Sequence, residues 1–137
     1  MPSWIARILD WSYFALFARI VLTFPFWASG LSKLIDFSGG AAEMAHFGLS
    51  PPAFVNALVL VTQLTGALLI IANRHVWVAT GALAVFTLLT IPIAHDFWNQ
   101  KGHIAQLEFF FVVEHISVIG GLMLAAILSR QSKHKGA

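Results

Sequence analysis

Long runs of apolar residues, separated by short polar stretches, are the dominant pattern along this chain. The runs cover about residues 13–34, 54–72, 76–94 and 106–128. As an α-helix, each run is close to the length that crosses a hydrocarbon layer of ~30 Å. The pattern therefore predicts an all-α, polytopic membrane protein in which four transmembrane helices form one bundle, with residues 1–137 as a single membrane domain.

The polar stretches between the runs carry residues that commonly begin or end helices. Glycine favours the end of a helix, whereas proline is accepted in its first turn and disrupts its interior. We therefore expect a loop over residues 36–52 and a tight polar link between the second and third helices. The stretches are 36–40 after the first run, 50–52 before the second, 73–75 between the second and third, and Pro92 with 95–102 after the third.

Small and polar residues also recur at helical spacing inside the runs. Residues three, four or seven positions apart lie on one face of a helix. Polar groups in hydrocarbon need partners, and small residues let helices approach closely, so we expect these faces to turn inward. They contain Arg19, Thr23, Phe26, Gly30 and Lys33 on the first predicted helix, Asn56, Gln63 and Ala67 on the second, Thr80, Ala84, Thr87 and Ala94 on the third, and Glu114, Gly121 and Ala125 on the fourth.

Composition agrees with a membrane protein and narrows its chemistry. Hydrophobic residues make up 58% of the chain and charged residues 10%, with a mean hydropathy of +0.81. The chain has no cysteine, so it cannot itself provide a thiol–disulfide couple, a thiolate metal site or an iron–sulfur cluster. The basic residues lie mainly near helix ends, which orients a membrane protein and indicates no nucleic-acid partner.

The distribution of basic residues predicts the orientation in the bilayer. An even number of crossings places both termini on one side of the membrane. Cytoplasmic loops carry an excess of lysine and arginine, so both termini are predicted to be cytoplasmic. The terminal side would hold Arg7, Arg74, Arg130, Lys133 and Lys135, and the opposite side Lys33 and Lys101.

Ionisable and amide side chains within the runs form the candidate site. Gln63, Glu114 and His115 are expected within a few ångströms of mid-bilayer, and Arg19 roughly 7 Å toward the cytoplasm, at ~1.5 Å of rise per residue. A pair between Arg19 and Glu114, with Gln63 beside it, is therefore geometrically feasible, while His115 is expected to face a neighbouring helix. Two interpretations stay open: a buried ion pair that secures assembly, and a cluster that handles protons or a ligand.

Histidines near the third run offer two further hypotheses. His95, Asp96 and His103 could gather a metal ion, although short polar loops often contain such residues. A haem held between His95 and His115 is disfavoured, because His95 is expected roughly 12 Å nearer the outer surface.

Three segments of the chain resemble a known family. They read Ser29-Gly30-Leu-Ser-Lys33-Leu-Ile-Asp36-Phe37, Met44-Ala-His-Phe-Gly48-Leu-Ser-Pro51, and Phe109-Phe-Phe followed by Gly120-Gly121-Leu-Met-Leu. These segments are similar to the DoxX family of small four-helix inner-membrane proteins, and the likeness extends over nearly the whole chain.

The resemblance implies that Arg19, Gly30 and Lys33 occupy typical family positions. Two positions depart from the pattern: Gln63 stands where the second helix usually carries glutamate, and Glu114-His115 stands where the fourth usually reads Lys-Asn. From the spacing alone, Lys33 is expected to pair with Asp36, three residues further along.

The same resemblance implies a role near membrane redox chemistry. Named DoxX relatives are linked to quinone-coupled sulfur oxidation or to membrane complexes that handle oxidative stress. We therefore expect a membrane subunit that supports a quinone-linked or redox-protective complex, with quinone as a candidate ligand and the catalytic cofactors on partner subunits. A small proton-coupled transporter or permeability protein, working as a homo-oligomer, and a scaffold without activity of its own are the alternatives.

Overall fold

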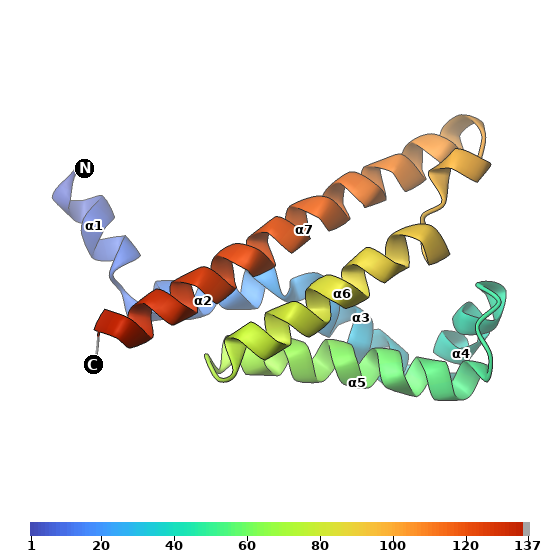
Figure 1. The fold of residues 1–137 in the computed structure, drawn as a ribbon, viewed down its shortest axis with the longest axis horizontal. Helices are drawn as coiled ribbons and strands as arrows, with labels where there is room; N and C mark the ends of the chain where they lie inside the picture. Colours follow the sequence, from blue (N-terminus) through green and yellow to red (C-terminus); the bar gives the residue numbers. More distant parts are fainter. Residues whose placement is uncertain (136–137) are drawn as a thin grey trace.

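A computed structural model describes the backbone of residues 1–135 and the side chains of residues 1–132, so the side chains of Lys133 and Lys135 lie outside it. Over these residues the chain is helical and contains no strand (Figure 1). Its elements are α1 (Ser3–Leu9), α2 (Ser12–Leu22), α3 (Phe24–Ile35), α4 (Phe37–His46), α5 (Pro52–Ile71), α6 (Val76–Ala94), the short 3-10 helix η1 (Phe97–Asn99) and α7 (Gly102–Lys135).

Three of these helices are long and apolar enough to cross a membrane, namely α5, α6 and α7. The pair α2 and α3 passes the same test together, but the two helices meet at an angle of 57°. The described residues thus contain three candidate spans, or four if the bent pair crosses as one. The prediction of an all-α protein with several spans is confirmed, and the count of four depends on this bent pair.

The bend between α2 and α3 has a local cause that the apolar pattern did not reveal. Pro25 occupies the first turn of α3, where its missing N–H and fixed φ are tolerated, but its ring cannot continue the preceding helix. Thr23 sits at the junction, and its hydroxyl donates to the carbonyl of Arg19 at 2.7 Å. The expected single helix over residues 13–34 is therefore two helices.

Residues 37–46 form the helix α4, so the prediction of a loop over 36–52 is wrong in this part. Asp36 begins the helix, because its carboxylate accepts hydrogen bonds from the backbone N–H of Gly39 at 2.9 Å and the Ser38 hydroxyl at 3.0 Å. The bond from Gly39, followed by that from Ser38, holds the pKa of Asp36 below its usual range. On the neighbouring helix α5, Asn56 donates to the carbonyl of Phe37 at 3.2 Å and holds α4 in place.

The helices run back and forth along the long axis of the molecule. The link at 73–75 is tight, as predicted, and Asn73 and His75 both adopt left-handed backbone conformations there. Figure 1 shows the start of α2, this link and the end of α7 at one end of the molecule, with α4 and η1 at the other. Which end is cytoplasmic stays a prediction.

The hydrophobic core lies in the half of the bundle next to the 73–75 link. Its members come from α3, α5, α6 and α7. The predicted inward faces of the first three helices are buried in large part, namely at Thr23, Gly30, Asn56, Gln63, Thr80 and Thr87, whereas Arg19, Lys33, Ala84 and Ala94 on the same faces are half-buried. The fourth predicted face differs, because Glu114 is exposed and Gly121 is half-buried. The core residues are Phe26, Ala67, Ile70, Val76, Ala79, Leu83 and Leu122.

Candidate functional site

The other half of the bundle contains an open-sided cavity of about 500 Å³. It forms because the backbones of α3 and α4 do not come close to that of α7 within the described part of the chain. Most of its wall is apolar, including Phe26, Met44, Val59, Phe86 and Val118. The polar groups that line it are Ser29, Lys33, Glu43, Gln63, Thr87, Thr90, His95, Glu114 and His115.

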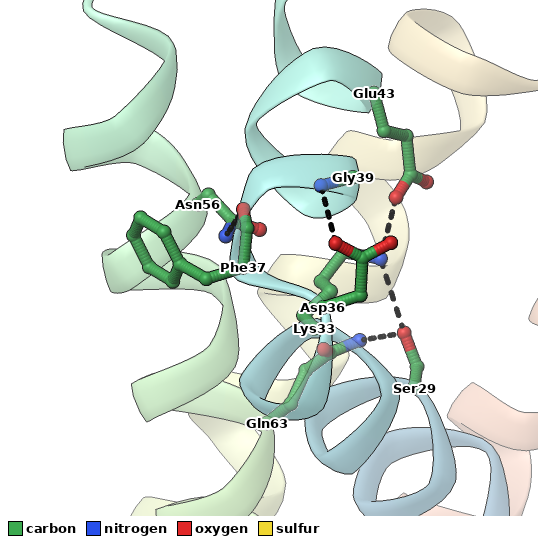
Figure 2. Close-up of polar contacts among 8 residues, drawn as sticks. All are labelled: Ser29, Lys33, Asp36, Phe37, Gly39, Glu43, Asn56 and Gln63. Carbon is green, nitrogen blue, oxygen red and sulfur yellow. Dashed lines mark hydrogen bonds and ion pairs between the residues drawn. The ribbon is translucent and has the colours of Figure 1, made fainter.

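One wall of the cavity, which we call the lysine wall, consists of Ser29, Lys33, Glu43 and Gln63. The ammonium group of Lys33 lies 2.7 Å from a carboxylate oxygen of Glu43 and donates to the Ser29 hydroxyl at 3.4 Å. The amide of Gln63 donates to the same hydroxyl at 3.2 Å. Figure 2 shows these side chains converging from α3, α4 and α5. The wall therefore combines a fixed cation with a chain of hydrogen bonds.

The carbonyl oxygen Oε1 of the Gln63 side chain lacks a hydrogen-bond partner among the described residues. The side chain is 5% exposed. Close packing of α3 on α5 keeps it in place, because a Cβ at Gly30 would come within 2.8 Å of Leu64 and 3.4 Å of the Gln63 Cβ. A buried acceptor without a partner costs about 1–3 kcal/mol. Because Oε1 is itself buried, the Gln63 side chain would have to turn toward the cavity for a group there to satisfy it.

The opposite wall, which we call the histidine wall, consists of His95, Glu114 and His115. The rings of His95 and His115 lie with their centroids 4.6 Å apart. His95 is joined to Glu108 by a 2.7 Å contact from Nδ1 to a carboxylate oxygen, and Nδ1 of His115 lies 2.7 Å from the carbonyl of Phe111. Glu114 has no ion-pair partner among the described residues. This wall therefore gathers titratable groups.

The expected pair between Arg19 and Glu114 does not form. Arg19 belongs to α2, on the far side of the bend from the cavity, and its Nε donates along its own helix to the carbonyl of Ala15 at 3.1 Å. Glu114 instead lines the cavity together with Gln63 and His115. Three of the four residues in the predicted polar cluster are thus brought together, and Arg19 is left out. The prediction included Arg19 because it assumed a straight first helix.

Two further expectations about lysine and histidine need correction. Lys33 pairs with Glu43 rather than Asp36, because Asp36 caps α4 and that short helix carries Glu43 back over Lys33. The expected separation of about 12 Å between His95 and His115 is wrong as well, since their rings are neighbours. The prediction counted depth along two straight helices and did not allow for α7 extending past the end of α6, which brings His115 next to His95.

The three candidate metal ligands, His95, Asp96 and His103, are not brought together. Within the part of the chain that the structure describes, no three His, Cys, Asp or Glu side chains are placed to hold one metal ion. His95 contacts Glu108, and the carboxylate of Asp96 accepts hydrogen bonds from Asn99 and Gln100 at 3.0 and 3.1 Å. His103 is exposed on the first turn of α7 and joins neither group.

Sequence reasoning missed Ser29, Glu43 and Glu108. Ser29 directly precedes Gly30 in a motif that had been singled out, so its position in a small-residue segment was the available signal. Glu43 lay in a stretch expected to be a loop, and Glu108 precedes the aromatic run at 109–111. Their roles depend on which helices face each other, and local spacing does not contain that information.

Chemically, the cavity offers hydrogen-bonding groups on two facing walls and apolar surface between them. The lysine wall provides donors from Lys33 and an acceptor on Gln63, and the histidine wall provides imidazole nitrogens and the carboxylate of Glu114. Its volume is within the usual range for small-molecule sites, and such sites are mostly apolar with a few polar groups. An amphipathic ligand with polar atoms at both ends of a flat head would match it.

Comparison with known proteins gives two matches and one negative result. The DoxX family model matches residues 14–96. The inner membrane protein YphA of Escherichia coli (strain K12) is 26% identical over 112 residues, which is 82% of this chain and 80% of that protein. No solved structure matches.

Proposed function

The chain belongs to the DoxX family, and we propose that it is a multi-pass inner-membrane subunit that binds a quinone and supports a quinone-linked or redox-protective complex. The electron-transfer cofactors of such a complex would reside on partner proteins. The chain has no cysteine with which to hold an iron–sulfur cluster or to exchange disulfides. Its contribution would be to present the quinone to those partners from within the bilayer.

The observation that carries this proposal is the pair of polar walls within a largely apolar cavity of about 500 Å³. A quinone has a flat ring with a carbonyl oxygen at each end and a long apolar tail. Lys33 and Gln63 would donate to one carbonyl. At the other end, Nε2 of His115 would accept a hydrogen bond from the hydroxyl that the reduced ligand carries there, because the Phe111 carbonyl holds the ring hydrogen on Nδ1. The apolar residues around them would contact the ring and the first part of the tail.

Gln63 also suits the reduced form of the ligand. A quinol carries hydroxyl groups where the quinone carries carbonyls, so it donates hydrogen bonds. The buried Oε1 of Gln63, which no described residue satisfies, could accept one of them once the side chain turns this oxygen toward the cavity. An amide can donate to a carbonyl and accept from a hydroxyl, so the same side chain can hold both oxidation states.

Quinone binding can be tested by titrating the purified chain in lipid nanodiscs with decylubiquinone and following tryptophan fluorescence. We expect saturable quenching. Gln63→Leu should weaken the affinity by about tenfold, the equivalent of one hydrogen bond. Gln106→Leu is the matched control, because Gln106 is exposed on α7 and does not line the cavity.

Quenching that does not saturate, or equal affinities for Gln63→Leu and the wild-type chain, would contradict the proposal. Proton-gradient-driven uptake into liposomes that is lost in Glu114→Gln, without any quinone binding, would favour the proton-coupled transporter instead. That second candidate is favoured by one observation, namely that Glu114 lines the cavity without an ion-pair partner in the described residues.

A further inference from the structure

A second cavity, of about 590 Å³, adjoins the first beside the residues that flank η1. Its wall includes polar residues from the link between α6 and α7, namely Asp96 and Gln100, and from the end of α4, namely His46. The two cavities share a boundary formed by Phe47, Ile93, Ala94 and His95. Of these four residues, His95 alone has a side chain that can carry a proton from one atom to another.

From this arrangement we propose that His95 and Glu108 form a proton relay between the main cavity and the second cavity. The relay would let a ligand in the main cavity exchange protons with water at the η1 end of the bundle. This inference rests on the proposed function for its physiological ligand, but the relay itself can be tested without any ligand.

His95 is placed to pass a proton across its ring, from Nε2 to Nδ1 and so toward the second cavity. Its Nδ1 lies 2.7 Å from Oε2 of Glu108, and both side chains are mostly buried, at 20% and 24% exposure. The second ring nitrogen, Nε2, has no hydrogen-bond partner among the described residues. Glu108 lines the second cavity and is absent from the wall of the first. The residue thus connects to the second cavity through Nδ1 and keeps Nε2 available.

His115 lines the main cavity and would take the proton from a ligand there. A carbonyl oxygen can only accept a hydrogen bond, so the 2.7 Å contact with Phe111 places the hydrogen of His115 on Nδ1. Its Nε2 is then the atom that takes up a proton. The ring of His95, with its centroid 4.6 Å away, is the neighbouring group to which that proton can pass.

Each step of the transfer moves one proton and conserves charge. His115 accepts a proton from the ligand at Nε2 and passes it to Nε2 of His95, directly or through one water. His95 releases its Nδ1 proton to the carboxylate of Glu108, which gives it to water in the second cavity. His95 ends neutral with its hydrogen on the other nitrogen, and a proton travelling the opposite way restores the first arrangement.

Other titratable groups near His95 are few. Asp96 precedes η1 and accepts hydrogen bonds from Asn99 and Gln100, and His46 lies across the second cavity. On α7, Glu114 is the neighbour of His115 in sequence. The helix α5, which also packs against α6, has no charged residue. The pair of His95 and Glu108 is thus the connection that the described residues offer between the two cavities.

The test measures how fast His115 gains and loses its proton. Histidine labelled with ¹⁵N is followed by NMR in lipid nanodiscs near its titration midpoint, where exchange broadening reports that rate, and His115→Gln assigns the signal. Replacing Glu108 by glutamine keeps the hydrogen bond to His95 but removes the proton acceptor. We expect Glu108→Gln and His95→Phe to slow the exchange on the order of 100-fold.

His103→Phe is the matched control, because His103 is exposed on α7 and lines neither cavity. A purely structural role for the His95–Glu108 contact predicts unchanged exchange in Glu108→Gln, and that result would overturn the relay. Adding decylubiquinone separates the two proposals. If exchange is slowed in Glu108→Gln and the chain does not bind quinone, the relay stands and the proposed function is wrong. If exchange in Glu108→Gln is normal and the chain binds quinone, the proposed function stands and the relay is wrong.

Discussion

The two halves of this bundle are built from similar apolar helices, yet one is packed and the other is hollow. Next to the 73–75 link, Leu83 and Ile70 are fully buried, and Gly66 lets α5 and α6 approach closely. At the other end, α4 and η1 lengthen the connections and α3 stays clear of α7. Connections of different length, rather than different hydrophobicity, therefore separate a structural half from a half able to hold a ligand.

Added volume in the packed half should have the largest effect. A Cβ at Gly66 would lie 2.7 Å from Cγ of Leu83, which is 0% exposed and cannot move aside. We expect Gly66→Val to lower the free energy of unfolding by about 1–3 kcal/mol, measured by thermal unfolding in detergent. Gly81→Val on α6 is the matched control, because a Cβ there meets nothing within 4 Å. Equal losses in both variants would show that helix propensity, and not packing, sets the cost.

Removing the cation of the lysine wall should have an intermediate effect. Lys33 is 12% exposed, but its partner Glu43 is 45% exposed, so solvent screens the pair. We expect Lys33→Met to reduce the free energy of unfolding by about 1 kcal/mol or less and to weaken decylubiquinone binding. Lys101→Met is the control, because Lys101 lies in the exposed link before α7. A loss of stability as large as that of Gly66→Val would mean that the hollow half is held together by this pair.

Added volume in the hollow half should affect stability least. Thr90 lines the main cavity and is half-buried, so a larger side chain there enters open space. We expect Thr90→Leu to change the free energy of unfolding by about 0.5 kcal/mol or less. Decylubiquinone affinity should fall by at least about tenfold, because the new side chain takes the place of the ligand. Thr65→Leu, at an exposed site on α5, should change neither quantity. Undiminished affinity in Thr90→Leu would place the ligand elsewhere.

Much of the fold could be predicted because it follows from local chemistry. The lengths of the apolar runs delimited α5 and α6 closely, and the spacing of Asn56, Gln63, Thr80 and Thr87 identified faces that are buried. A residue's face on a straight helix depends only on counting. The same counting failed at Pro25, where the first helix bends, because the prediction assumed one straight helix.

The candidate site was predictable only in part, for the same reason. The sequence by itself determined that Gln63, Glu114 and His115 are polar groups within apolar runs, and that no cysteine takes part. It could not place Glu43 beside Lys33 or His95 beside His115, since each pair joins separate helices. The bend at α3, the helix α4 and the reach of α7 decide those contacts. The cavity itself is a property of the tertiary structure alone, because it exists only where helices that could have packed together stay apart.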